Sequence, residues 1–377
     1  MEASPTQPSA TSQTGPIVVY GATGYTGKLI AAELADSDLD FQLAGRNREK
    51  LEELRRELGV NVPVRAVSTD DAEGLRKVFD PAAAVIACAG PFYLHGGPVL
   101  AAAVDTGTHY LDTTGEQPFM KFALDHYGPE AEENGSAVVS GMGFDYVPGD
   151  MIAALTAAGM GELDTIRLGY VTNFQMTRGT MLSALEMIKG GDLEWRDGRL
   201  QPAPQSVGRG KFDFGDAGEK FMTRYPAGEH VTVPRHVRTR RVETMLSADS
   251  IAPGPVARLA PLIARPAGLA MRTHAKNVAE RLITRLPEGA DPESRSAATF
   301  TVGCEAIQGS RIRRGRVTGK DIYGLTAALL VKGAALAATG QIRGKGGLAP
   351  SQAFDPETFM DALDRFELKY SVDSLPA

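Results

Sequence analysis

A glycine-rich turn directly behind a β-branched run constrains this chain more than any other feature. Residues 17–20 read I-V-V-Y, a composition typical of a buried parallel strand. Residues 21–27 follow as G-A-T-G-Y-T-G, and a helix-forming run comes after them. Gly21 permits the tight turn, Gly24 lets a pyrophosphate approach the backbone, and Gly27 lets the helix pack close to the strand. This order predicts a dinucleotide-binding site, with an ordinary tight βα turn as the alternative.

The end of the second predicted strand distinguishes NADP from NAD. An NAD site usually has Asp or Glu at this position, where the carboxylate binds the ribose 2′-hydroxyl. Here residues 41–45 lead instead to Arg46 and Asn47, and a helix is predicted over 49–58. A guanidinium at the strand end can pair with a 2′-phosphate and stack on adenine. The sequence therefore predicts NADP(H) as the cofactor, with a solvated loop arginine as the alternative.

Strand and helix signals go on alternating after this point. Further apolar runs lie at 64–67, 83–88, 108–112 and 137–141, and helical stretches such as 99–104 and 119–127 separate them. The alternation predicts an α/β fold with a doubly wound (Rossmann) parallel sheet. Ligands bind at the carboxyl ends of such strands, so the small and polar residues there are candidate contacts. The predicted cofactor-binding residues are Gly21, Ala22, Thr23, Gly24, Tyr25, Thr26, Gly27, Arg46, Asn47, Ser68, Asp70, Ala89, Gly90 and Pro91.

The pattern changes beyond residue 150. A strand over 165–171, a helix over 180–188 and hairpins over 193–200 and 299–318 no longer fit a doubly wound sheet. They predict a second α+β domain inserted before a returning C-terminal helix. We expect a disordered tail over 1–14, an NADP-binding Rossmann domain over 15–149, a substrate and dimerisation α+β domain over 150–319, and C-terminal helices over 320–377 that return to the Rossmann domain.

Several segments together carry a resemblance to a known family. They are G-A-T-G-Y-T-G (21–27), A-G-R-N (44–47), C-A-G-P-F (88–92), H-Y-L-D-T-T-G-E (109–116), G-F-D-Y-V-P-G-D (143–150) and G-K-D-I-Y-G-L-T-A (319–327). The chain resembles the saccharopine dehydrogenase-like family of NADP-binding oxidoreductases, and residues 225–236 are similar to its short bacterial members. The resemblance implies the fold, the cofactor and a helix after residue 320 that packs on the nucleotide domain. It leaves the substrate open, because the family includes amino-acid reductases, polyamine enzymes and trans-acting enoyl reductases.

Composition excludes several other classes. With 377 residues, 43% hydrophobic and 23% charged, the chain is globular and large enough for two domains. A net charge of −6 disfavours nucleic-acid binding, and the arginine clusters over 235–241 and 311–316 fit solvated faces. No apolar run reaches about 18 residues, so no membrane span is predicted. The absence of a leader pattern and the two lone cysteines, Cys88 and Cys304, predict a reduced cytoplasmic protein without a metal site.

Catalytic candidates are side chains that follow strand ends. Hydride transfer needs the cofactor close to an acceptor carbon, and the proton comes from a side chain or from water. Asp145 and Tyr93 are the candidate catalytic residues, although Asp145 fits a helix cap equally well and Tyr93 fits simple packing. Asp112 is assigned to hydrogen bonds within its own turn. The candidate substrate-binding residues are Glu116, Tyr146, Arg178 and Thr180.

These features predict an NADPH-dependent oxidoreductase that reduces a C=C, C=N or C=O bond of a small or carrier-bound metabolite. The alternatives are a Rossmann protein that senses NADP(H) without turnover and an interaction protein that only borrows the fold. A homodimer through the second domain is expected, because the family resemblance implies it and because the sheet there needs cover for its edges.

Overall fold

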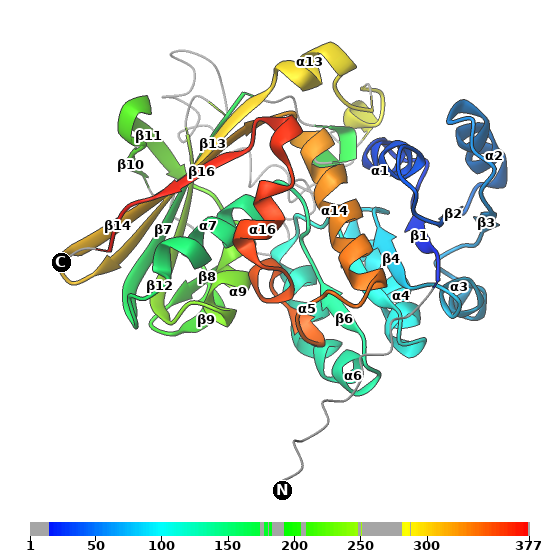
Figure 1. The fold of residues 1–377 in the computed structure, drawn as a ribbon, viewed down its shortest axis with the longest axis horizontal. Coiled ribbons are helices and arrows are strands. Elements are labelled where there is room, and N and C mark those ends of the chain that lie inside the picture. Colours follow the sequence, from blue (N-terminus) through cyan, green and yellow to red (C-terminus); the bar gives the residue numbers. More distant parts are fainter. Residues whose placement is uncertain are drawn as a thin grey trace, which may run out of the picture.

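A computed structural model describes residues 15–173, 177–179, 181–182, 192–204, 209–247, 250, 281–286 and 288–375, and its two sheets lie on opposite sides of the molecule (Figure 1). The predicted tail over 1–14, Thr180 and most of the helix predicted over 180–188 lie outside these residues. No helix in the described ranges is long and apolar enough to cross a bilayer.

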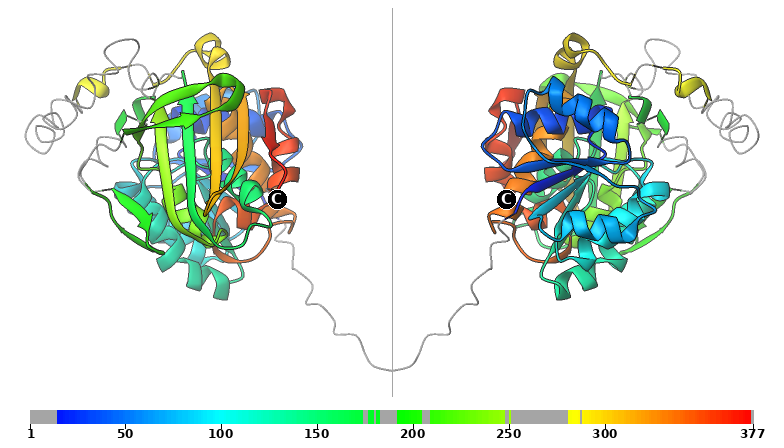
Figure 2. Two further views of the ribbon diagram at one scale, coloured as in Figure 1. Left: turned by 90° about the vertical axis from the view of Figure 1, so that its left-hand side faces the viewer. Right: turned by 90° about the vertical axis from the view of Figure 1, so that its right-hand side faces the viewer.

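The first sheet is parallel throughout and has the strand order β15-β6-β5-β4-β1-β2-β3 (Figure 2, right). Its described strands are β1 (Ile17–Tyr20), β2 (Phe41–Gly45), β3 (Val64–Ala66), β4 (Ala84–Ala87), β5 (His109–Asp112), β6 (Ala137–Val139) and β15 (Gly346–Leu348). The order reverses between β1 and β4, which is where doubly wound sheets bind their ligands. The prediction of a doubly wound sheet is confirmed. Strand β15 was not predicted, because it is short and contains two glycines, which are depleted in strands.

Helices cover both faces of this sheet. One face carries α1 (Tyr25–Ala35), α2 (Arg48–Glu57) and α14 (Ile322–Ala338). The opposite face carries α3 (Ala72–Phe79), α4 (Phe92–Asp105), α5 (Gln117–His126) and α6 (Gly128–Glu133). In β1, Ile17 and Val19 pack against the first group and Val18 and Tyr20 against the second. All four side chains are therefore buried, which explains why the strand reads as an unbroken apolar run.

Helix α4 begins earlier than predicted. The sequence indicated a helix over 99–104, whereas α4 begins at Phe92 and ends at Asp105. Residues 96–98 read G-G-P, and glycine and proline are the weakest helix formers. The sequence pattern therefore did not predict the first turns of this helix. Tyr93, which was expected to follow a strand end, therefore lies in the first turn of a helix.

The second sheet is mixed and has the strand order β10-β11-β12-β7-β13-β14-β16, with β8 and β9 attached at β12 (Figure 2, left). Its described strands are β7 (Leu163–Thr172), β8 (Leu193–Arg196), β9 (Arg199–Pro202), β10 (Arg209–Asp213), β11 (Glu219–Arg224), β12 (Thr239–Ser247), β13 (Thr299–Gln308), β14 (Arg311–Lys320) and β16 (Lys369–Val372). The pair β12 and β7 is parallel, and the other neighbours are antiparallel. A second sheet unit of α+β type, with both predicted hairpins, is therefore present.

The remaining described helices are short and accompany the second sheet and the C-terminal segment, except α7, which links the two units. They are α7 (Val147–Ala157), α9 (Glu229–Thr232), α13 (Pro292–Ala297), α15 (Pro350–Ala353), α16 (Pro356–Asp361) and the 3₁₀ turns η1 (Gly215–Ala217), η2 (Val233–Arg235) and η4 (Asp364–Phe366). Helix α7 leaves the end of the first sheet and packs with Met151 and Ile152 in one apolar core with Val302 and Val317 of the second. One continuous core thus ties the units together.

The C-terminal segment is shared between the sheets. Helix α14 packs on the first sheet and strand β15 pairs with β6 of that sheet, whereas β16 pairs antiparallel with β14 of the second sheet. Without β16, strand β14 would be an open edge, so this pairing protects it.

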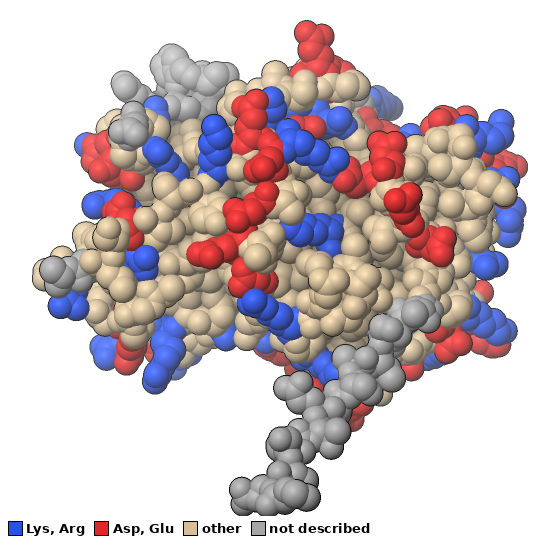
Figure 3. Space-filling model, viewed as in Figure 1, with Lys and Arg blue, Asp and Glu red and all other residues tan. Residues whose placement is uncertain are grey.

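The predicted arginine clusters serve structural contacts. Arg313 donates hydrogen bonds to the carbonyl oxygens of Leu155, Thr156 and Ala158 at 3.5, 3.3 and 2.8 Å, which caps the carboxyl end of α7. On the face shown in Figure 3, acidic and basic side chains lie next to one another. Ion pairs such as Lys320 with Glu367 (2.6 Å) join charged side chains elsewhere in the described chain as well.

Candidate active site

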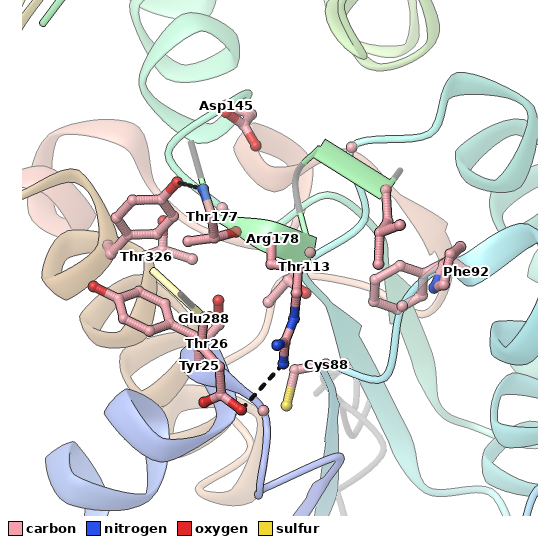
Figure 4. Close-up of a pocket in the computed structure, with 18 of the residues that line it drawn as sticks. Tyr25, Thr26, Cys88, Phe92, Thr113, Asp145, Thr177, Arg178, Glu288 and Thr326 are labelled. Carbon is pink, nitrogen blue, oxygen red and sulfur yellow. Dashed lines mark hydrogen bonds and ion pairs between the residues drawn. The ribbon is translucent and has the colours of Figure 1, made fainter. Parts of the chain in front are cut away.

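A cavity of about 450 Å³ lies at the carboxyl ends of β1, β2, β4, β5 and β6 (Figure 4). The residues that line it at the strand ends are Gly24, Tyr25, Thr26, Arg46, Cys88, Gly90, Pro91, Phe92, Thr113, Gly115, Gly143 and Asp145. The remaining lining residues are Thr177, Arg178, Gly179, Leu182, Glu288, Ile322, Tyr323 and Thr326. Both sheet units and α14 therefore contribute to a single site at the switch point of the first sheet.

The three glycines of the turn have three different environments. Gly21 has φ +87°, and a Cβ there would lie 2.8 Å from the Ala89 nitrogen. A Cβ on Gly27 would lie 2.3 Å from the Gly21 oxygen and 2.8 Å from the Cα of Ala22, so α1 packs directly on the turn. Gly24 is exposed, and its nearest neighbour, the Gly21 oxygen, would be 3.5 Å from a Cβ. The fold itself requires glycine at positions 21 and 27. At position 24 the fold does not require glycine, and only the approach of a ligand to the backbone would.

The amino end of α1 is open to the cavity. Gly24 is the N-cap, no side chain caps the helix, and its first turn has no acidic residue. The first backbone N–H groups of a helix lack intrahelical acceptors and carry partial positive charge. This end, with Tyr25 and Thr26 on the cavity wall, is suited to an anionic phosphate.

Arg46 follows β2 and lines the same cavity. Its side chain is exposed and forms no ion pair with any described residue. The guanidinium is therefore available to a ligand phosphate. Asn47 accepts a hydrogen bond from the Lys50 N–H at 3.0 Å and so caps α2.

The remaining predicted cofactor residues lie outside the cavity lining. Ser68 donates to Asp70 at 3.4 Å, and both belong to the turn after β3. Thr23 is also absent from the lining. Ala89 packs against Gly21 and Ala22 packs against Gly27, so both support the turn without lining the cavity.

Asp145 lies at the bend between β6 and α7, with its carboxylate directed toward the cavity (Figure 4). It makes no hydrogen bond or ion pair with another described side chain. The N-cap of α7 is Tyr146, and no side chain caps this helix, so the capping alternative is excluded. Burial raises the pKa of Asp145 to about 6. An unpaired carboxyl with this pKa can hold a proton near neutral pH and give it up to a bound molecule.

A second buried carboxyl lies close to Asp145. Glu229 of α9 is fully buried, and its Oε1 accepts a hydrogen bond from the Tyr170 hydroxyl. Its Oε2 is buried without a partner among the described residues. Burial raises the pKa of Glu229 to about 8, so the group is protonated at pH 7. Glu229 therefore places no full negative charge beside Asp145 at neutral pH.

Tyr93 and Glu116 do not have the predicted roles. The Tyr93 side chain is 71% exposed and does not line the cavity, which removes it as a candidate donor. The Glu116 carboxylate is buried and accepts hydrogen bonds from the N–H groups of Phe92 and Tyr93 at 2.9 and 2.8 Å. It caps α4 and fixes the loop that carries Pro91, rather than facing a substrate.

Two further predictions concern residues of the same region. The Tyr146 hydroxyl is buried and donates to the Gly115 oxygen, so it supports the cavity wall without lining it. Asp112 accepts hydrogen bonds from the N–H groups of Thr114 and Gly141 at 3.0 and 2.8 Å, in agreement with a structural role.

Sequence reasoning missed the contribution of α14. Thr326 accepts a hydrogen bond from the Phe144 N–H at 3.1 Å, and the Tyr323 hydroxyl accepts one from the Thr177 N–H at 2.9 Å. Both polar residues stand three positions apart in an apolar helix, a spacing that places them on one face. That spacing was the available signal. Glu288 had no comparable signal, because it reaches the site from a distant loop.

The fold and the cavity define a class, namely a Rossmann protein whose cavity at the switch point of the sheet is completed by a second sheet unit. Residues 17–139 match the family model of the saccharopine dehydrogenase NADP binding domain. This match confirms the resemblance and the cofactor predicted from the sequence.

Curated relatives match part of the chain. It is 37% identical to a trans-acting enoyl reductase of Mycobacterium leprae over 140 residues, which cover 36% of this chain and 34% of the relative. A Mycobacterium tuberculosis protein named as a candidate for the same activity is 36% identical over 192 residues, 48% of this chain and 46% of the relative. The chain thus spans less than half the length of these relatives.

Solved structures match the whole architecture. The apo saccharopine dehydrogenase (L-Glu forming) of Saccharomyces cerevisiae has a TM-score of 0.60 at 13% identity and covers 96% of this chain and 100% of that chain. The homospermidine synthase of Legionella pneumophila in complex with NAD has a TM-score of 0.56 at 9% identity, with 96% and 92% covered. At these identities the likeness concerns the fold alone.

Proposed function

We propose that this protein is an NADPH-dependent oxidoreductase that reduces a C=C, C=N or C=O bond of a small or carrier-bound metabolite. The observation that carries the proposal is a single cavity that joins the phosphate turn, Arg46 and the unpaired carboxyl of Asp145. NADPH supplies a hydride when it is bound. The chain then has to hold the phosphates, orient the acceptor and deliver one proton to the atom that the hydride leaves anionic.

Each of these tasks has a residue in the cavity. The turn from Gly24 to Thr26 and the guanidinium of Arg46 bind phosphate groups by hydrogen bonds and charge. The small residues at the ends of β4 and β5, such as Gly90 and Gly115, leave room for a flat ring. Asp145 holds the proton. The carbon–carbon bond is favoured among the three by the names of the mycobacterial relatives.

A protein that binds NADP(H) without turnover is the alternative. Incubation with NADPH and a broad set of enoyl, imine and carbonyl compounds, with absorbance at the NADPH band as readout, separates the two. Oxidation that depends on one acceptor class supports the reductase, and binding without oxidation across the set supports the sensor.

Arg46→Ala should weaken NADPH binding by roughly 1.5–3 kcal/mol and leave NADH binding nearly unchanged, because the lost contact is a charge-assisted hydrogen bond to the 2′-phosphate. Fluorescence titration of both cofactors measures it. Arg48→Ala is the matched control, since Arg48 is exposed on the adjacent helix and does not line the cavity. An equal loss for both cofactors would contradict the assignment.

We also propose a homodimer through the second sheet. Among the described residues, β10 and β16 are the outer strands of this sheet, and the apolar Phe221 of β11 is 67% exposed. Light scattering at working concentrations should give twice the mass of the chain, and a monomeric mass would rule the proposal out.

A further inference from the structure

Glu288 places a carboxylate in the cavity beside the phosphate turn. Its Oε1 lies 3.2 Å from Arg178 Nη2, the ion pair drawn as a dashed line in Figure 4. Its Oε2 lies 3.7 Å from Lys28 Nζ in α1. One internal anion therefore engages two cations at the place where an anionic ligand would bind.

Residues 288–290, which carry Glu288, pack against Tyr25 at the amino end of α1. The Tyr25 hydroxyl donates to the Ala290 oxygen at 2.8 Å, and a Cβ on Gly289 would lie 2.5 Å from the Tyr25 ring. The backbone N–H of Arg178 donates a hydrogen bond to the backbone carbonyl oxygen of Glu288 at 3.1 Å. The two residues are therefore joined through their backbones as well as through their side chains. Residues 288–290 thus lie directly against the first turn of the helix.

The charges at this point conflict with a bound dinucleotide. A pyrophosphate brings negative charge to the amino end of α1, where Glu288 already contributes one. Arg178 has the planar guanidinium that makes paired hydrogen bonds to phosphate, but its Nη2 is paired with the Glu288 carboxylate. All three charged side chains are between one third and one half exposed, so the pairs are weak enough to exchange partners.

We propose that Glu288 is an internal competitor of the cofactor: it holds Arg178 in the free protein, and a phosphate group of the dinucleotide takes Arg178 over on binding. Glu288 then retains only Lys28 or turns to solvent. The inference rests on the proposed function, because it assumes that a dinucleotide enters this cavity. In this proposal Arg178, which lies outside the Rossmann sheet, binds a phosphate group of the cofactor. Glu288 is the residue that limits the affinity for NADPH.

Glu288→Gln should bind NADPH about 3- to 10-fold more tightly than wild type, because the substitution removes the carboxylate that holds Arg178 and so releases this guanidinium for a phosphate. Fluorescence titration at fixed low salt measures the change. Glu293→Gln is the matched control, since it makes the same charge change at an exposed position of α13 that does not line the cavity. We expect the control to alter affinity less than about twofold.

A double-mutant cycle identifies the route of the effect. Arg178→Ala should weaken NADPH binding about 10-fold or more, and adding Glu288→Gln to it should change affinity less than about twofold. The same gain in both backgrounds, or no gain in wild type, would overturn the proposal. Failure of every form to bind NADPH would remove the proposed function as well, whereas equal binding by wild type and Glu288→Gln would remove this inference alone. Thermal unfolding of each variant verifies that it is folded.

Discussion

Gly24→Val should lose at least about 100-fold in NADPH affinity, which corresponds to about 2.7 kcal/mol, while the protein stays folded. Gly24 has φ −77° and ψ 166°, a conformation that valine adopts readily. A Cβ there would contact the Gly21 oxygen at an ordinary 3.5 Å, so the backbone position itself accepts a Cβ. The valine methyl groups would instead occupy the space above the open end of α1 that a pyrophosphate needs. Fluorescence titration measures the affinity for NADPH, and a thermal melt verifies that the variant is folded.

Two other glycines serve as controls for this result. Gly97→Val makes the same change in α4, where no atom lies within 4 Å of the new Cβ, and should leave NADPH binding intact. Gly27→Ala would place a Cβ 2.3 Å from the Gly21 oxygen and should destabilise the fold itself. Unchanged affinity in a folded Gly24→Val variant would mean that the turn is only structural.

The first sheet could be predicted because its signals are local. A strand buried on both faces reads as an apolar run, as residues 17–20 do, and the glycine spacing after it fixes the turn. Arg46 was assigned on the same basis; it lines the cavity, and its guanidinium pairs with none of the described residues. Strand β15 could not be predicted, because its pairing with β6 depends on a contact between segments about 200 residues apart.

The errors at the site have one physical origin. A residue that follows a strand end is brought near the cleft, but its side chain direction depends on packing that the sequence does not display. Glu116 and Tyr93 both follow strands, yet one caps α4 and the other is turned to solvent. The parts of the wall that come from α14 and from Glu288 depend on how the two units dock, which no local pattern encodes.

Asp145→Asn should lower kcat by about 10²- to 10⁴-fold with NADPH affinity retained, if Asp145 supplies the proton or orients the water that does. Asparagine keeps the size of the side chain but cannot donate an acidic proton. The structural cost should stay within about 0.5 kcal/mol, since Asp145 caps no helix and bonds no described side chain. Steady-state rates with an acceptor found by NADPH oxidation measure the effect. Tyr93→Phe is the control, and its rate should be unchanged because the Tyr93 side chain points to solvent.

The dependence of kcat on pH distinguishes a proton donor from a general base at Asp145. Burial raises the pKa of Asp145 to about 6, so the acid form predominates below pH 6 and is depleted above it. If the protonated carboxyl is the donor, wild-type kcat should fall as pH rises through 6, by up to about tenfold per unit, and the residual rate of Asp145→Asn should lack that limb. A general base would give the opposite slope, with the rate falling toward acid. Equal turnover and equal pH profiles in wild type and Asp145→Asn would leave water as the proton source and the positions of cofactor and acceptor as the whole mechanism.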